Sequence, residues 1–411
     1  MNGSNFQVEQ PCPQCGAPII IDETDRILAC QFCRTRVYLA TEDHFRFFLP
    51  PQKDIAEDIF FIPYWRVKGL AYTIRPSDIA YKYFDTNFLA LESQMLPHSL
   101  GLRPQAMKLK FVGGAGQTGR YLASSRKSTQ NLLERYQNCT GNRNNQEIFI
   151  GETKSVIYAP VYFARDQLFD AILKKPLLNP SASAQIRPLL EESQPEIWQV
   201  EFVPLLCPNC GADLPGEKDA MILFCSNCNS AWNPSARHVP RVSFSTWQQQ
   251  GEGLIYLPFW QMKVKVTGLQ LDTYADLIRV ANLPKVPSDI WARTPFYFQI
   301  PAFKVQPALF LRWCRQMTAQ PAATALSDWL PSGKIYPVTL PLPEALESSM
   351  ITLASLIADK RHLLEVIAPL RLELEDSTLV LHPFSISARE LIHAEWGFSM
   401  DIASLNLGAY L

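Results

Sequence analysis

Four C-x-x-C pairs constrain the fold of this 411-residue chain more than any other feature of its sequence. They form two sets of four: Cys12, Cys15, Cys30 and Cys33 in the first half, and Cys207, Cys210, Cys225 and Cys228 in the second. In both sets fourteen residues separate the two pairs, which is close to the spacing of tetrathiolate zinc sites. Each C-x-x-C turn directs two thiolates at a point about 2.3 Å away, and the second pair completes a tetrahedron. The sequence therefore predicts two metal sites, each ligated by four sulfur atoms.

The ligand type favours structural Zn²⁺, two ions per chain, over a catalytic metal. Four cysteine ligands close the coordination sphere and leave no position for water or substrate. An iron redox site, and disulfides or redox dithiols, are the alternatives. Residues 1–10 contain no basic segment followed by an apolar run, so they do not predict a secretory signal. We therefore expect a cytoplasmic protein, where reducing conditions disfavour disulfides.

The residues around the cysteines predict tight turns and short strands. Gly16 and Gly211 directly follow the second cysteine of each leading pair, where a positive φ is often needed. Apolar residues 19–21 and 26–29 flank a polar segment, which predicts a hairpin within the first set. Residues 221–224 predict a corresponding strand in the second set.

The two cysteine segments, residues 12–38 and 207–232, resemble the zinc ribbons of general transcription factors and of small RNA polymerase subunits. They are also similar to the rubredoxin knuckle, which can hold iron. The resemblance covers about 25 residues of each half, and the remaining chain resembles no family closely. It implies a metal site in each ribbon and does not indicate a function.

An internal duplication relates the two halves. Adding 195 to the number of each first-half ligand gives a second-half ligand, and the same offset maps residues 62–68 onto residues 257–263. Weaker echoes relate Leu96-Pro97 to Ile300-Pro301, and residues 158–160 to residues 382–384. The repeat is too long for a solenoid unit of about 20 to 50 residues, so we expect two domains with separate cores.

The duplication divides the chain into five predicted segments, and the fold class that we expect is α+β, predominantly β. The segments are zinc ribbon 1 at 1–50, a β-rich body at 51–175, a proline-rich linker at 176–204, zinc ribbon 2 at 205–247, and a second β-rich body at 248–411. Runs of β-branched and aromatic residues predict strands in the bodies. They lie at 60–73 and 254–274, with a hairpin at 371–381 around Asp376-Ser377. Helical spacing predicts helices at 128–138, 307–317 and 343–358.

Charge excludes some classes of partner. The chain has 39 acidic and 38 basic residues, whereas a dedicated nucleic-acid coat or a polybasic membrane binder needs a surplus of cations. Residues 103–143 carry eight bases and one acid, so this segment could contact phosphates. Residues 341–411 carry ten acids and four bases and could instead neutralise it. Nucleic-acid binding is therefore possible but not favoured. No apolar run approaches the roughly 20 residues of a membrane span.

Enzyme signatures are missing from the sequence. The six histidines are scattered, and the glycine-rich loop at 113–119 lacks the Lys and Ser/Thr of a phosphate-binding loop. Cys139 and Cys314 have no motif around them, and we expect small buried side chains. The repeated Pro-Tyr-Trp and Pro-Phe-Trp elements at 63–65 and 258–260 are interpreted as core residues rather than stacking platforms.

We therefore expect a non-enzymatic zinc-binding adaptor or scaffold, whose two structural ribbons present binding surfaces to a protein partner. Two such ribbons at a set separation would allow bivalent engagement. The alternative is a nucleic-acid-binding zinc-ribbon protein that uses the basic segment 103–143.

Overall fold

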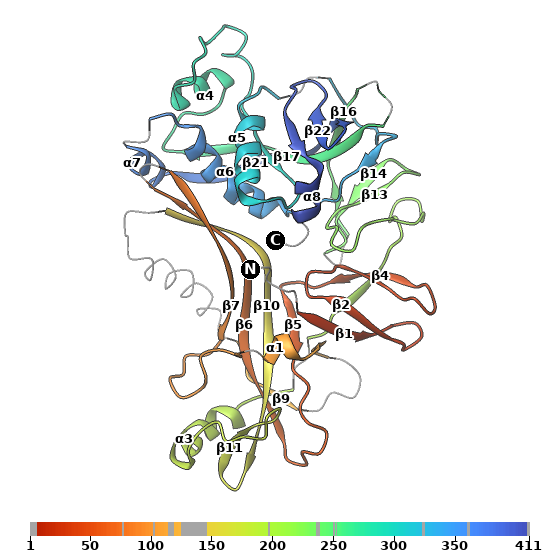
Figure 1. The fold of residues 1–411 in the computed structure, drawn as a ribbon, viewed down its shortest axis with the longest axis vertical. Coiled ribbons are helices and arrows are strands. Elements are labelled where there is room, and N and C mark those ends of the chain that lie inside the picture. The colour runs from red at the N-terminus through yellow and green to blue at the C-terminus, as the bar shows by residue number, and fades with distance from the viewer. Residues whose placement is uncertain are drawn as a thin grey trace.

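The computed structural model describes most of the chain. The described residues are 6–75, 78–101, 103–113, 119–124, 146–195, 198–235, 239–249, 251, 253–322, 325–359 and 362–408. The fold is mostly β, with 40% strand and 16% helix, as the sequence predicts. Figure 1 shows an elongated molecule, with the first-half body below, the second-half body above, and both cysteine segments on one side.

The first-half body is built around two long strands, β6 (Ile59–Ile74) and β10 (Gln146–Ala164), which pair antiparallel along their length. The strand order through the body is β8-β5-β10-β6-β7. Two further strands attach to this path: β11 pairs with β10, and β9 pairs with β6. The bounds of the remaining strands are β5 (Phe45–Phe48), β7 (Ile79–Leu89), β8 (Leu109–Phe111), β9 (Arg120–Tyr121) and β11 (Gln167–Asp170).

The second-half body repeats this topology, which confirms the duplication. Its long strands are β17 (Ile255–Thr267) and β21 (Arg371–Ser387), and the strand order is β19-β16-β21-β17-β18. Here β22 pairs with β21 as β11 pairs with β10, and β20 pairs with β17 as β9 pairs with β6. The remaining bounds are β16 (Phe244–Trp247), β18 (Phe298–Pro301), β19 (Leu326–Ser327), β20 (Lys334–Ile335), β22 (Glu390–His393) and β23 (Ser399–Asp401).

The strand register corrects the residue correspondence that the sequence suggested at the two weaker similarities between the halves. Leu89 pairs with Tyr64 as Pro301 pairs with Phe259, so residues 88–89, and not Leu96-Pro97, correspond to Ile300-Pro301. Pro160 pairs with Phe61 as Pro383 pairs with Tyr256, so the later echo is one residue out of register. Sequence similarity is too weak there to define an alignment, whereas cross-strand hydrogen bonds define it directly.

Two of the predicted helices are present, and several were missed. Helix α5 (Pro307–Thr318) begins with the proline expected in its first turn, and α6 (Leu342–Leu356) matches the third predicted helix. The predicted helix at 128–138 lies outside the described residues. The others are α1 (Arg103–Ala106), α3 (Pro180–Glu191), α4 (Tyr274–Ala281), α7 (Leu363–Ile367) and α8 (Ile402–Gly408). Strand β17 ends at Thr267, before the end of the strand predicted at 254–274, and helix α4 begins at Tyr274 after a capping box formed by Thr273 and Asp276.

The predicted linker at 176–204 is folded. It contains helix α3, whose first turn is capped by the Asn179 side chain accepting from the Ala182 N–H at 2.8 Å, and strand β12 (Glu201–Pro204). Ile186 and Leu190 of α3 are buried in the first-half core. Prolines suggested a spacer, but Pro180 occupies a first-turn position where its missing N–H costs nothing.

The hairpin predicted at 371–381 is also wrong. Strand β21 pairs with β17 on both sides of Asp376 without reversing direction. The register shifts where Lys263 pairs with Asp376 and Val264 with Leu374, which leaves Glu375 as an extra residue. The polar residues therefore mark a β-bulge rather than a turn.

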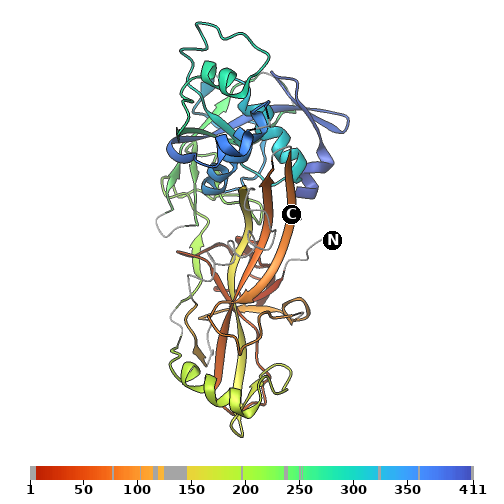
Figure 2. The same cartoon turned by 90° about the vertical axis from the view of Figure 1, so that its left-hand side faces the viewer.

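Each body has a buried core of its own, as the sequence predicts, but the ends of two first-half strands also enter the core of the second half. Tyr72 and Ile74 of β6 and Ile148 and Ile150 of β10 belong to the buried cluster of the second half. The Tyr72 hydroxyl donates to the Pro307 carbonyl at 3.1 Å, and Figure 2 shows the first-half strands reaching the upper body. In the described part of the chain, no helix is long and apolar enough to cross a membrane.

Candidate metal centres

Three of the four C-x-x-C knuckles are turns of strand hairpins, and the fourth, at Cys207 and Cys210, is closed by a single bridge between Leu206 and Asp213. Strands β1 (Gln7–Pro11) and β2 (Pro18–Asp22) pair across the first knuckle, and β3 (Ile27–Ala29) and β4 (Arg36–Ala40) pair across the second. The predicted pairing of residues 19–21 with 26–29 is therefore wrong, although both strands exist. In the second half, β13 (Leu223–Cys225) and β14 (Ser230–Trp232) pair in the same way, and β15 (Arg241–Val242) extends that sheet.

The structure brings each predicted set of four cysteines together. Within each set the four sulfur atoms lie within 4.8 Å of one another. Sulfur distances within the sets include Cys12 to Cys33 at 3.5 Å, Cys15 to Cys30 at 3.7 Å, Cys207 to Cys228 at 3.4 Å and Cys210 to Cys225 at 3.5 Å. A tetrahedron with bonds of about 2.3 Å places its sulfurs about 3.8 Å apart, whereas a disulfide needs about 2.05 Å. The spacing therefore fits a four-coordinate metal ion.

Backbone conformation holds the knuckles. Gly16 and Gly211 have φ of 72° and 73°, as predicted, and their N–H groups donate to the Cys12 and Cys207 carbonyls at 2.9 and 2.8 Å. In the later knuckles Arg34 and Asn229 take the equivalent position, with φ of 62° and 54°. A positive φ recurs there without glycine, because the turn must bring both thiolates to one side.

The ligands differ in exposure in the same way in both ribbons. Four cysteines are buried beneath the sites, namely Cys12, Cys30, Cys207 and Cys225. Cys15, Cys33 and Cys210 are exposed, and Cys228 is half-buried. Each metal position therefore lies at the surface of its ribbon, with two ligands packed inward and two facing outward.

A hydroxyl residue supports the last ligand of each set. Thr35 Oγ1 lies 3.2 Å from Cys33 Sγ, and Ser230 Oγ, at the position equivalent to Thr35, lies 3.0 Å from Cys228 Sγ. Hydrogen bonding with the Thr35 side chain and backbone lowers the pKa of Cys33 to about 6. Burial, together with the neighbouring cysteines, raises the pKa of Cys225 to about 12. Metal binding must therefore displace a proton from the buried side of the second site.

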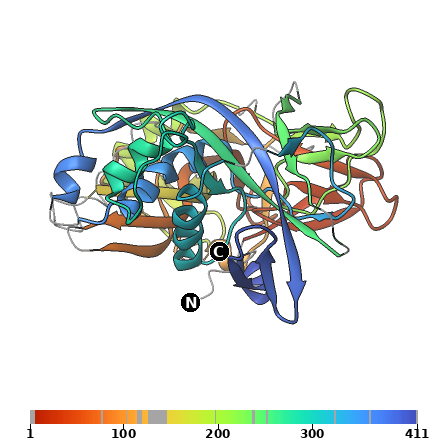
Figure 3. The ribbon, with the colours of Figure 1, turned by 90° about the horizontal axis from the view of Figure 1, so that it is seen from above.

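The two ribbons lie side by side and pack on each other. Strand β12, which leads into ribbon 2, pairs antiparallel with β4 of ribbon 1. Figure 3, viewed from above, shows both ribbons grouped at one side of the molecule. The expectation of two separate binding units is corrected accordingly: the ribbons form one composite unit.

Two buried side-chain clusters were missed by the sequence analysis. The first joins ribbon 1 to the long sheet: Arg66 of β6 is fully buried, lies 2.9 Å from Glu23, and also pairs with Asp85 of β7. Its guanidinium stacks on Phe6 at 4.1 Å. Burial raises the pKa of Glu23, against the attraction of Arg66. The 195-residue offset places Gln261 at the position of Arg66, so the repeat offered no signal for this ion pair.

The second cluster is a pair of buried histidines, His382 and His393, 3.1 Å apart between Nδ1 and Nε2. His393 Nδ1 accepts the N–H groups of Glu395 and Trp396 at 3.2 and 3.1 Å, so its proton lies on Nε2 and is donated to His382. Trp247 packs against both rings. Ten residues separate these histidines in sequence, and only the β21–β22 register brings them together.

The equivalent turn of the first half is capped by a carboxylate. Asp170 ends β11 as His393 ends β22, because Val161 pairs with Asp170 as Phe384 pairs with His393. Asp170 Oδ1 accepts the N–H groups of Ile172 and Leu173 at 2.8 and 2.9 Å. The two halves therefore build the same turn with different acceptors.

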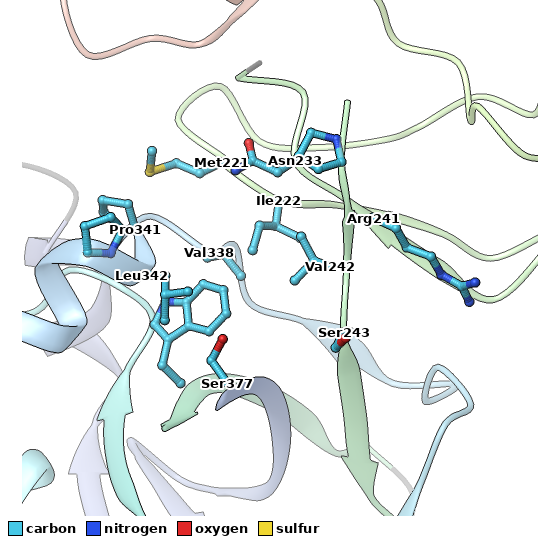
Figure 4. Close-up of a pocket in the computed structure, with 13 residues that line it drawn as sticks. Met221, Ile222, Asn233, Arg241, Val242, Ser243, Val338, Pro341, Leu342 and Ser377 are labelled. Carbon is cyan, nitrogen blue, oxygen red and sulfur yellow. The ribbon is translucent and has the colours of Figure 1, made fainter. Parts of the chain in front are cut away.

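A cavity of about 410 Å³ lies between ribbon 2 and its body. Figure 4 shows Ile222, Val242 and Val338 around it, while the Arg241 guanidinium points away. Its other lining residues include Trp260, Leu342 and Ser377, and none of the lining residues is an acid, a histidine or a cysteine. The cavity therefore holds no set of groups for acid–base or nucleophilic chemistry.

The other residues that the sequence analysis singled out either lie in the core or fall outside the part of the chain that the structure describes. Tyr64, Trp65, Phe259 and Trp260 are buried, which confirms their interpretation as core. Cys314 is buried, and burial raises its pKa. Cys139 and residues 114–118 of the glycine-rich loop lie outside the described residues, as does most of the basic segment 103–143. Within that segment, Arg120 donates to the Glu191 and Ser193 carbonyls.

Comparisons with known proteins leave the site without a named relative. No protein-family model matches the chain, no curated protein matches it, and no solved structure matches it. The two halves of the chain resemble each other: each has the same topology and a four-cysteine cluster positioned to hold a metal ion.

Proposed function

We propose that this protein is a non-enzymatic, cytoplasmic scaffold in which two structural Zn²⁺ ions hold a composite ribbon unit that binds a protein partner. The donor sets support zinc, because four thiolates at tetrahedral spacing close the coordination sphere. Zinc binding contributes on the order of 10 to 16 kcal/mol to small domains of this kind. That is enough to order ribbons whose own cores are small.

The observation that carries the partner proposal is Phe32, whose exposed fraction is 75%. Phe32 lies between two ligands, Cys30 and Cys33, so the metal knuckle fixes its backbone. A large apolar side chain held rigidly in water loses little conformational entropy when a partner covers it. Phe32 is therefore the anchor that we assign to the partner interface.

Ribbon 2 differs at the same positions. The residue equivalent to Phe32 is Asn227, and the equivalent of Arg34 is Asn229. The Asn229 side chain donates to the Asp328 carbonyl and accepts from the Leu330 N–H. Ribbon 2 therefore uses its knuckle to bind its own body, which leaves the ribbon 1 knuckle for a partner.

Two measurements test the proposal. Elemental analysis of reduced protein should return two equivalents of zinc. Crosslinking in the native cytosol should recover a partner that Phe32→Ala loses. Val286→Ala, at a residue with an exposed fraction of 87%, is the matched control and should keep it. Equal recovery with both variants would refute the assignment of Phe32, and metal well below two equivalents would refute the zinc scaffold.

A further inference from the structure

We infer that the two metal sites are thermodynamically coupled, so that metal bound at one ribbon strengthens metal binding at the other. The inference rests on the proposed metal binding and goes beyond the scaffold function. It follows from three contacts between the ribbons: a shared sheet, a shared core and a loop of ribbon 2 that binds the backbone of ribbon 1.

The shared sheet connects ligands of both sites. Strand β4 begins three residues after Cys33, and β12 ends three residues before Cys207. The two strands pair from Val37 with Pro204 to Ala40 with Glu201. Order imposed by metal at Cys33 is therefore transmitted to the strand that positions Cys207.

The shared core depends on both ribbons. Ile27, Tyr38 and Ala40 of ribbon 1 form one buried cluster with ribbon 2. The ribbon 2 members are Leu205, Cys207, Leu214, Ala220, Leu223 and Cys225. Two of these, Cys207 and Cys225, are themselves inner ligands of the second site. Because Tyr38 is fully buried in this cluster, loss of order in ribbon 2 exposes apolar surface of ribbon 1.

A loop of ribbon 2 binds the ribbon 1 backbone directly. The Lys218 carbonyl accepts the N–H groups of Arg26 and Ile27 at 2.6 and 2.9 Å, and Arg36 donates to the Gly216 carbonyl at 3.0 Å. A Cβ at Gly216 would lie 2.4 Å from Leu223 and 3.1 Å from Ile27. Leu223 belongs to ribbon 2 and Ile27 to ribbon 1, so a larger side chain at position 216 must displace side chains on both sides of the contact.

Coupling follows from the cost of ordering. Each ribbon needs its metal to order, and a ribbon ordered by metal presents a formed surface to its neighbour. The second metal then orders less chain when it binds. Linkage requires that each site affects the other by the same factor, which for typical couplings is about 5- to 150-fold.

The population of one-metal protein tests the coupling on the unmodified chain. Apo-protein is loaded with one equivalent of Zn²⁺ under reducing conditions and measured by native mass spectrometry. Independent sites, whether equal or unequal in affinity, leave at least half of the molecules with one ion. For sites of equal affinity, a coupling of 5-fold or more lowers that fraction to about a third or less. Because unequal affinities raise this fraction, the inference is overturned if one-metal protein makes up at least half of the total and the fraction does not rise further in Gly216→Val, a substitution in the contact between the ribbons.

A Co²⁺ titration, followed by the thiolate-to-metal absorption, tests whether the contact between the two ribbons transmits the coupling. Gly216→Val should weaken the affinity of both sites and raise the one-metal fraction, whereas the control Gly251→Val, at a glycine with ordinary contacts and outside the ribbons, should not. Unchanged affinities in Gly216→Val would refute the shared surface as the route. Binding of two equivalents without coupling would leave the scaffold proposal standing, so the two failures are distinguishable.

Discussion

The buried histidine pair makes a quantitative prediction about acid stability. Burial lowers the pKa of His393 to about 4 and the pKa of His382 well below its ordinary value. Because the folded-state pKa lies below the unfolded value of about 6.5, the unfolded chain takes up protons first as the pH falls. The stability that neutral His393 provides is therefore complete above pH 6.5 and is lost between about pH 6.5 and 4. For His393 alone the loss is on the order of 3 kcal/mol.

His393→Asn isolates this contribution. The asparagine oxygen can accept the Glu395 and Trp396 N–H groups, as the Asp170 carboxylate accepts the equivalent groups of the first half, and asparagine does not titrate. Between pH 7 and pH 4.5 the free energy of unfolding should fall by about 2 kcal/mol less in the variant than in the unmodified protein. Urea unfolding at both pH values, followed by tryptophan fluorescence, measures the difference.

Metal loss at low pH affects both proteins equally and cancels in this comparison. His98→Asn, which replaces an exposed histidine, is the matched control and should retain the acid sensitivity of the unmodified protein. An equal loss of unfolding free energy in His393→Asn and in the unmodified protein would refute the burial argument.

Three further outcomes follow from the sites. Chelation of both metals should remove amide-exchange protection from residues 12–38 and 201–232 while β6 and β10 stay protected, as read by exchange mass spectrometry; retained ribbon protection would contradict structural metals. Arg66→Ala leaves Glu23 buried without its partner and should cost about 3 to 5 kcal/mol of unfolding free energy, whereas Arg66→Met with Glu23→Gln should cost much less. Thr35→Val removes the hydroxyl near Cys33 and should weaken metal affinity at ribbon 1 by about 10- to 100-fold in chelator competition, with ribbon 2 as the internal reference.

Local sequence predicted the elements that depend on neighbouring residues. The C-x-x-C knuckles and Gly16 are short-range features, because ligand geometry and positive φ are set within a few residues. Helix α5 was predicted from its spacing and its first-turn proline. The hairpin pairing around residues 22–25 was mispredicted, because a strand's apolar character does not specify which neighbour it pairs with.

The sequence by itself determined that this chain is a duplicated, mostly β protein with two four-cysteine clusters. Only the tertiary structure decided that the ribbons form one unit, that the first-half strands enter the second-half core, and that His382 meets His393. The physical reason is the separation in sequence between the residues that interact. Thiolate knuckles and helix starts are set by residues close in sequence, whereas β12 on β4 or Tyr72 against Pro307 depends on surfaces that exist only after both partners have folded.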